Sequence, residues 1–274
     1  MSDFPSNPAA RPGHVLEFGD EFDGDALDLD KWLPCHLPHW SSRHLARARA
    51  GVADGCLTLR IDDDQAPWCP EFDGAVRVSS LQTGGFAGPV GSPVGQHRFN
   101  PAAVVREAQP TRASYVPLHG CFELRARGPA APDCHAALWM IGYEDEPERS
   151  GEICICELFG KEAGRGSSVV RFGVHPFGDA RIVDDFRRVE LPLDTREFHL
   201  YAAEWTPHRV SFFVDNREIG VVEQSPGYPM QFMLGIYQRP QADVAEPAAG
   251  ARQFVVDYFR AYRSAGSSPA HFLR

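Results

Sequence analysis

The chain has 274 residues, with 27 Lys or Arg and 37 Asp or Glu, and its formal net charge at pH 7 is −10. This charge is the opposite of what a phosphate-binding surface needs, so nucleic acids and anionic membranes are excluded as expected partners. No apolar run approaches the roughly 20 residues of a membrane-spanning helix, which predicts a soluble protein. An all-β chain of this length commonly folds as one unit, and we expect a single domain over residues 13–263 with flexible ends at 1–12 and 264–274.

The first residues and the cysteines bear on the cellular compartment. The opening MSDFPSNPAARPGHV has neither the basic nor the apolar region of a secretory signal peptide. The 7 cysteines are an odd number without a CxxC pair, so free thiols are expected rather than a disulfide framework. As written, the sequence favours a cytoplasmic protein, or an extracellular one if a leader has been removed.

Short β-branched and aromatic runs separated by Gly and Pro predict an all-β sandwich or barrel. The predicted strands, in chain order, cover residues 14–18, 56–61, 76–81, 115–127, 135–141, 152–159, 169–175, 197–205, 210–214, 218–222, 231–237 and 254–262. Asp215-Asn216 can supply the positive φ angles of a two-residue hairpin turn. In the last strand, strict alternation places Tyr258 on the same face as Phe254 and Val256.

Residues 62–114 are the least regular part of the chain, rich in Gly, Pro and Asp, with one strand pattern at 76–81. Long loops in compact domains are usually binding loops or disordered segments. We find no internal repeat and no linker that would divide the chain.

Two glutamates, Glu152 and Glu157, flank the apolar stretch Ile153–Cys156. Paired carboxyl groups are the usual equipment for cutting a glycosidic bond. Strict alternation sends the two side chains to opposite faces because their offset is odd. A β-bulge at Ile155-Cys156 would return Glu157 to the face of Glu152. The alternative is that both are solvent-facing residues of an ordinary strand.

This segment resembles the active-site strand of glycoside hydrolase family 16, the laminarinase-like glucanases, whose bulged pattern is Glu-x-Asp-x-x-Glu. The match here is EICICE at 152–157, preceded by ALWM at 137–140, which is similar to the family's Phe-Trp-Met stretch. Further matches are FGDEF at 18–22, DKW at 30–32, YAAEWTP at 201–207 and VDY at 256–258.

The resemblance implies a concanavalin A-like β-jelly roll, a sandwich of two curved antiparallel sheets with the glycan in a concave cleft. Glu152 matches the nucleophile and Glu157 the general acid/base of a retaining double displacement. The acid must hold its proton near neutral pH, and burial next to Glu152 would raise its pKa. The implied function is an endo-acting β-glycosidase for a β-1,3- or mixed-linked β-glucan.

The sequence departs from the family at Cys154, which stands where the family has an Asp that hydrogen-bonds the nucleophile. A thiol is a weak donor and is mostly neutral below its reference pKa of about 8.5. We expect a slower hydrolase, and the competing hypothesis is a member that binds glycan without cutting it.

Two other readings involve the thiols. Cys154 or Cys156 could be a nucleophile partnered by His135 or His175, although no protease-like signature surrounds either cysteine. A zinc site that includes Cys134 would match no standard spacing. Buried free thiols are the plainer interpretation.

Aromatic and histidine side chains are the candidate substrate contacts. Trp139 matches a family position in the cleft, and Trp205 matches another, with a core role as its alternative. Trp40 and Trp68 lie in loops that could rim the cleft. His175 resembles the family's histidine on the adjacent strand, where it would orient Glu157 or a hydroxyl; the alternative is a satisfied polar residue.

Many relatives hold a structural Ca²⁺ on the convex face. Asp257 and Gly55 match two of the implied ligand positions, and a site near Glu21 could supply the third. The alternative is that Asp257 is bonded to local backbone. Apart from this ion no cofactor is expected, and the expected partner of a monomeric chain is a polysaccharide or oligosaccharide substrate.

Overall fold

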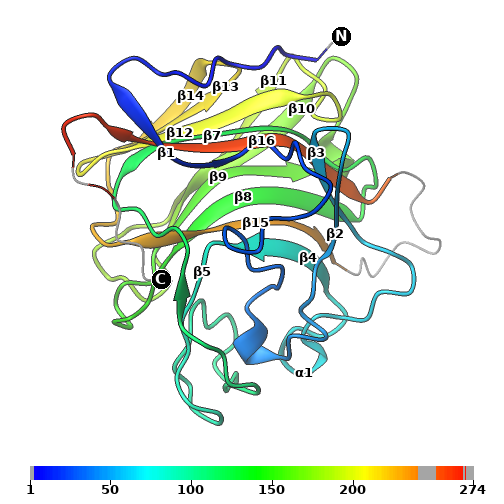
Figure 1. The fold of residues 1–274 in the computed structure, drawn as a ribbon, viewed down its shortest axis with the longest axis vertical. Helices are drawn as coiled ribbons and strands as arrows, with labels where there is room; N and C mark the ends of the chain where they lie inside the picture. The colour runs from blue at the N-terminus through cyan, green and yellow to red at the C-terminus, as the bar shows by residue number, and fades with distance from the viewer. Residues whose placement is uncertain (1–2, 240–250, 268, 270–274) are drawn as a thin grey trace.

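Two large antiparallel sheets form the body of the computed structural model, which describes residues 3–239, 251–267 and 269 (Figure 1). In spatial order the larger sheet contains β14 (Arg217–Val222), β13 (Val210–Val214), β12 (His199–Trp205), β7 (Gly120–Arg127), β16 (Gln253–Ser264), β3 (Cys56–Arg60) and β2 (Arg49–Ala53), with β1 (His14–Asp20) also paired to β16. The smaller sheet contains β11 (Asp185–Leu191), β10 (Ser168–His175), β9 (Glu152–Phe159), β8 (Cys134–Gly142), β15 (Met230–Gln238) and β4 (Arg77–Gln82). The expected all-β sandwich is therefore confirmed.

Short elements decorate the sandwich. They are a ribbon of β5 (Gly84–Gly85) with β6 (Arg112–Ala113), the short helix α1 (Pro70–Asp73), and 3₁₀ turns at Pro38–Trp40 and Gly160–Glu162. Among the described residues, no helix is long and apolar enough to cross a membrane. All seven cysteines are free thiols, as expected.

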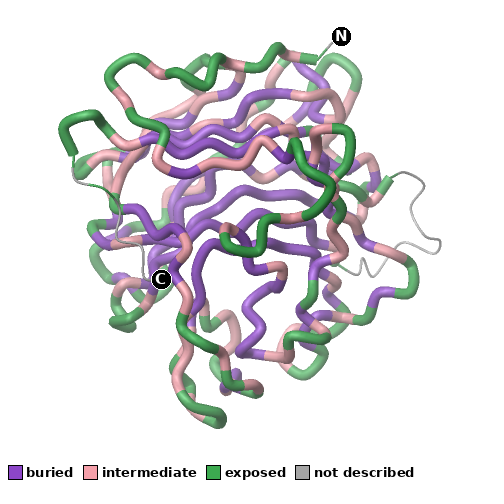
Figure 2. Tube along the Cα trace, in the orientation of Figure 1, coloured by how far each residue is buried: buried purple, intermediate pink, exposed green. Residues whose placement is uncertain are grey.

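Most buried hydrophobic residues form two clusters, one on each face of the smaller sheet, and a third, small cluster contains Ala113, Val116 and Tyr143. The main core lies between the sheets, where Leu138 and Met140 of β8 meet aromatic residues such as Phe259 of β16. Ala137 and Trp139 alternate with them and point to the opposite face, where the loops before β4 and after β5 build a second cluster. Figure 2 shows the buried strands of both sheets and the buried stretches within these loops. The alternation of β8 thus separates the core from the face that carries the site.

Apart from the two-residue strands β5 and β6, two strands escape the pattern analysis, and both lie at the edges of the large sheets. β11 (DFRRVEL) and β2 (RAGVA) end the two sheets and are half-exposed or exposed along most of their length, so neither carries a clear apolar alternation. The strand predicted from residue 115 begins only at Gly120. The hairpin turn at Asp215-Asn216 is confirmed by φ angles of 50° and 63°.

The strict alternation predicted for the last strand is wrong. The register of β16 against β7 shifts between Val256 and Tyr258, which marks a bulge. As a result Phe254 and Val256 face the core together with Phe259, while Tyr258 lies outside that cluster.

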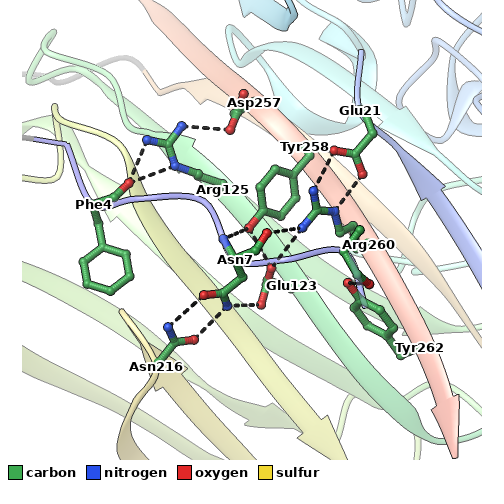
Figure 3. Close-up of polar contacts among 11 residues, drawn as sticks. Phe4, Asn7, Glu21, Glu123, Arg125, Asn216, Asp257, Tyr258, Arg260 and Tyr262 are labelled. Atoms are coloured by element: carbon green, nitrogen blue, oxygen red, sulfur yellow. Dashed lines mark hydrogen bonds and ion pairs between the residues drawn. The ribbon is translucent and has the colours of Figure 1, made fainter. Parts of the chain in front are cut away.

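The N-terminal end, expected to be flexible over residues 1–12, crosses the outer face of the larger sheet and is held there (Figure 3). Arg125 donates two hydrogen bonds to the Phe4 carbonyl oxygen, of 3.0 and 2.7 Å. Asn7 donates a 2.6 Å bond to Glu123. Polar residues on the outer face of the sheet therefore bind part of the segment for which the sequence predicts a flexible end.

At the other end, β16 reaches Ser264, and residues 265–267 and 269 are also described. The rest of the predicted flexible end, at 268 and 270–274, lies outside the described residues.

Candidate active site

A β-bulge in β9 sets the geometry of the site. On β8, Leu138 pairs with Cys156 and Trp139 pairs with Cys154, so Ile155 is an extra residue without a partner on that strand. Ile155 and Cys156 both pack in the main core, whereas Cys154 belongs to the cluster on the cleft face. The bulge predicted at Ile155-Cys156 is confirmed.

The bulge brings Glu152 and Glu157 into one cleft of about 410 Å³ on the face of the smaller sheet opposite the core. Burial raises the pKa of Glu152 well above its ordinary value, and the charge of Glu157 raises it further. Burial also raises the pKa of Glu157, although the positive charges of Arg171 and His175 oppose that shift. The two carboxyls therefore hold a proton to higher pH than an isolated glutamate.

Cys154 lies between the two glutamates and is 1% exposed. Burial raises the pKa of its thiol well above the usual range, and the carboxylates of Glu157 and Glu152 add to the shift. Among the described residues the Cys154 thiol has no hydrogen-bond partner. The Cys154 thiol is therefore a neutral, packed group that makes none of the hydrogen bonds an Asp would make.

The thiol-nucleophile and zinc readings find no support. Cys156 is buried in the main core, where burial raises its pKa to about 12. Within residues 3–239, 251–267 and 269, no group of three or more His, Cys, Asp or Glu side chains is placed to hold a metal. Both thiols are packed residues.

His175 lies in the cleft on β10, directly opposite Glu152 of β9. Its Nδ1 is 2.5 Å from Oδ1 of Asp184, a residue that the sequence analysis did not single out. Asp184 immediately precedes an edge strand with no clear pattern, so nothing in the sequence pointed to the pair. Asp184 fixes the His175 ring on the side of the cleft where β10 passes.

Two of the four tryptophans proposed as substrate contacts line the cleft. Trp139 does so from β8, and its Nε1 donates a 2.8 Å hydrogen bond to the Tyr237 hydroxyl. Trp68 lines the cleft from a loop but is only 1% exposed, and its Nε1 donates to Asp73 at 2.7 Å. Trp139 is the better placed of the two to stack against a sugar.

The other two tryptophans do not reach the cleft. Trp40 is fully buried in the cluster of loops and donates a 2.8 Å hydrogen bond to the Gln96 carbonyl oxygen. Trp205 belongs to the larger sheet, packs in the main core and donates to Ser225 at 2.8 Å. The expectation that they contact substrate is wrong because the loops fold over Trp40 and the larger sheet faces away from the cleft at Trp205.

Several lining residues were missed by the sequence analysis of the site. Neither loop histidine shows a pattern in the sequence, His135 was considered only as the partner of a thiol nucleophile, and Tyr237 and Arg239 were given no role. These residues are His36, His97, His135, Tyr237 and Arg239.

The expected calcium ligands do not form a metal site. Asp257 accepts a 2.8 Å hydrogen bond from Arg125, and both carboxylate oxygens of Glu21 accept from Arg260 at 2.7 and 2.8 Å (Figure 3). Gly55, with a φ of 69°, occupies the turn between β2 and β3. Because guanidinium groups already supply positive charge to both carboxylates, the residues present do not fit a calcium ion.

Comparison with known proteins agrees with this geometry. The sequence profile of Glycosyl hydrolases family 16 matches residues 109–259, just over half of the chain. A glucan endo-1,3-beta-glucosidase from Cryptopygus antarcticus is 26% identical over 233 residues, which cover 82% of this chain and 74% of that protein.

Solved structures give the same result for the fold. A GlcNAcα1-4Gal-releasing endo-β-galactosidase from Clostridium perfringens superposes with a TM-score of 0.84 at 30% identity, covering 97% of this chain and 66% of that one. This chain thus spans slightly less than two thirds of the clostridial protein. A laminarinase from Flavobacterium sp. has a TM-score of 0.64 at 18% identity, covering 91% of this chain and all of that one. The jelly-roll sandwich is shared, and the chain belongs to glycosyl hydrolase family 16.

Proposed function

We propose that this chain is a retaining, endo-acting β-glycosidase in which Glu152 is the nucleophile and Glu157 the general acid/base. The proposal rests on the bulge in β9. Because of this bulge, two glutamates five positions apart both point into one desolvated cleft. Paired carboxyls in such a cleft are the equipment of a double displacement at a glycosidic carbon.

The two carboxyls would act in sequence. Glu152 attacks the anomeric carbon and forms a glycosyl-enzyme ester, while Glu157 gives its proton to the leaving oxygen. Glu157 then takes a proton from water, whose oxygen attacks the anomeric carbon and releases Glu152. The raised pKa of Glu157 suits the first step, because it keeps the acid protonated at a pH where an exposed glutamate is ionised.

The proposed substrate is a β-1,3- or mixed-linked β-glucan; the similar protein from Cryptopygus antarcticus is named a glucan endo-1,3-beta-glucosidase. A β-galactoside-containing glycan is a second candidate. It is favoured by the TM-score of 0.84 and 30% identity to the clostridial endo-β-galactosidase over 97% of this chain.

A glycan-binding protein with weakened catalysis is the alternative that Cys154 favours. The thiol provides no hydrogen bond to the nucleophile, so the electrostatic support that the family's Asp supplies is missing. Both principal carboxyls are present, and we therefore place hydrolysis first.

The test is reducing-sugar release from a panel of β-1,3-glucan, mixed-linked glucan and β-galactan, measured for the wild type, Glu152→Gln and Glu157→Gln. Wild-type release, lost by at least about 1,000-fold in Glu152→Gln, is the expected result. An activated aryl β-glycoside should still glycosylate Glu152 in the Glu157→Gln variant, because its leaving group needs no proton.

Unchanged hydrolysis in Glu152→Gln would refute the assigned nucleophile. Tight binding of one glycan without any hydrolysis would replace the proposal with the glycan-binding alternative. A matched control is Glu190→Gln, an exposed glutamate of the same sheet on the edge strand β11.

A further inference from the structure

Three histidines of the cleft have hydrogen-bonding capacity that the protein does not use. His36, His97 and His135 all line the cleft that holds the two glutamates. Among the described residues, no hydrogen-bond partner exists for either ring nitrogen of any of the three, and Nδ1 of His36 and of His97 is fully buried. Buried polar groups in native proteins are nearly always hydrogen-bonded, so this set needs an explanation.

Aromatic packing fixes the ring of His135. It is stacked between Phe159 at 4.7 Å and Tyr237 at 4.9 Å, with interplanar angles of 15° and 17°. A ring held on both faces can reach a ligand only through its edge, where the nitrogens are.

The ring of His36 is also held by aromatic neighbours. It meets Trp68 edge-on at 4.6 Å and Tyr237 edge-on at 5.5 Å. His36 is 6% exposed, so its position is set by packing rather than by solvent.

His97 is held by its backbone as well as by its ring. Its φ is 49°, an unfavourable value for a residue with a Cβ, and its N–H donates a 2.6 Å hydrogen bond to Glu144. The ring packs edge-on against Trp139 at 5.0 Å and Phe177 at 4.6 Å. Glu144 and Phe177 also have positive φ, of 55° and 43°. Strain of this kind persists where the surrounding structure requires it and clusters at functional sites.

The three rings are neutral at physiological pH. Burial lowers the pKa of His36 and His135 to about 3 and that of His97 to about 4. A neutral imidazole has one donor and one acceptor nitrogen, and a sugar hydroxyl can serve either of them.

The charge of the cleft also limits the ligand. The carboxyl groups of Glu152, Glu157 and Asp73 line it, with Arg239 as a basic neighbour. Several carboxyl groups and uncharged imidazoles give a poor site for a sulfated sugar or a uronic acid, because the ligand's anionic groups would meet like charge.

We infer that His36, His97 and His135 are specificity-determining residues, which hydrogen-bond hydroxyl groups of an uncharged hexose chain lying on Trp139. The inference rests on the proposed glycosidase function. It adds the class of glycan and the histidine side chains that recognise it. A site built to hydrogen-bond hydroxyls discriminates strongly against ligands that lack them, since its buried nitrogens are then left unpaired.

The test uses His→Phe variants, which keep an aromatic ring and remove both nitrogens. Binding of laminarihexaose and of β-1,4-galactohexaose is measured by calorimetry in the Glu157→Gln background, so that no ligand is consumed. We expect each of His36→Phe, His97→Phe and His135→Phe to weaken binding of the preferred hexaose by about tenfold. Hexagalacturonate, an anionic probe, should not bind.

His119→Phe is the matched control. His119 also has an unpartnered buried ring nitrogen and packs edge-on against Trp205 at 4.9 Å, but it lines a different cavity on the larger sheet. Its replacement should leave hexaose binding unchanged.

A second measurement guards against variants that fail to fold. In the otherwise unaltered Glu157→Gln protein, the ring ¹⁵N resonances of the three cleft histidines should shift on addition of the hexaose, and that of His119 should not. His97→Asn, which keeps a donor and an acceptor, should bind better than His97→Phe.

The two proposals fail differently. If the wild type hydrolyses no glycan of the panel, the proposed function falls, whatever the histidine variants do. If neither hexaose moves the histidine resonances, if all three His→Phe variants bind like their parent, or if hexagalacturonate binds best, the histidine assignment is wrong.

Discussion

Trp139 and Tyr237 are joined by a 2.8 Å hydrogen bond from the indole Nε1 to the phenol hydroxyl, across the neighbouring strands β8 and β15. The bond fixes the plane of the one tryptophan that is well placed to stack on a sugar. Tyr237 in turn packs against His36 and His135, so one phenol ring supports three residues of the cleft.

Replacing Tyr237 by Phe should therefore weaken substrate binding more than catalysis. The indole N–H loses its partner, which costs about 1–3 kcal/mol, and the ring of Trp139 gains freedom. We expect KM to rise by several-fold with kcat nearly unchanged, measured by steady-state kinetics. Tyr143→Phe is the control: the Tyr143 hydroxyl is also hydrogen-bonded, donating to the Arg112 carbonyl at 2.9 Å, but Tyr143 does not line the cleft. Equal KM effects in both variants would refute the specific role of Tyr237.

Cys154→Asp should increase kcat. An Asp at this buried position, beside Glu152 and Glu157, would keep its proton and could donate it in a hydrogen bond to the nucleophile. A hydrogen bond to a charged group is worth about 1.5–3 kcal/mol, so an increase of about tenfold or more is expected in reducing-sugar assays across pH. Cys156→Asp, in the core, should instead unfold the protein. Lower turnover in a folded Cys154→Asp protein would contradict the idea that the thiol limits catalysis.

Glu144 should make the protein less stable as pH rises. Burial raises its pKa from 4.5 to about 8, so the folded state binds this proton more tightly than the unfolded state does. The resulting stabilisation is complete below about pH 4.5 and is lost as pH rises through 8.

Glu144→Gln imitates the protonated form and keeps the oxygen that accepts from His97. Its Tm should match the wild type near pH 4.5 and exceed it by about 10 °C or more near pH 9, since raising the pKa from 4.5 to about 8 corresponds to roughly 5 kcal/mol and 1 kcal/mol to about 2–4 °C in a protein of this size. Parallel Tm–pH curves for the two proteins would show that the carboxyl does not titrate as described.

Arginines, rather than a metal ion, should stabilise the outer face of the larger sheet. A chelator such as EDTA is expected to leave Tm unchanged, whereas Arg260→Met should lower it by about 10 °C. Arg260 is 6% exposed, binds Glu21 and the Asn7 carbonyl, and lies 3.9 Å from the buried carboxylate of Glu123. Removing Arg260 leaves the Glu123 charge buried without its partner, which costs about 3–5 kcal/mol. Arg187→Met removes a half-exposed pair with Asp185 and should change Tm little. A large loss of Tm in EDTA would restore the calcium hypothesis.

The geometry of β9, the strand with the two proposed catalytic glutamates, could be predicted from the sequence because it follows from the alternation of side chains along a strand. The odd offset between Glu152 and Glu157 requires one extra residue if both are to face the cleft, and the register of β9 contains it. The same reasoning fails for β16. Its bulge beside Asp257 could not be predicted, because no pair of charged residues or motif in the sequence requires an extra residue there.

The cleft walls were less predictable, because loops rather than strands supply them. Trp40 and Trp68 sit in loops and would ordinarily be read as exposed, yet these loops bury their own apolar cluster and enclose both indoles. His36 and His97 come from the same region, and their rings pack against Tyr237 and Phe177, which lie about 200 and 80 positions further along the chain. Such tertiary packing has no periodic signature in the chain.

The contact of Asn7 with Tyr258 and Arg260 joins residues about 250 positions apart, and among the described strands β1 pairs only with β16. On the ribosome, the first strand is made long before its partner emerges. The larger sheet therefore cannot be completed during synthesis of the first nine tenths of the chain, and the outer face that Asn7 covers stays open until the last strand arrives. Refolding should accordingly be slow, as in other folds built from distant pairings, and its final phase should be the docking of the N-terminal segment.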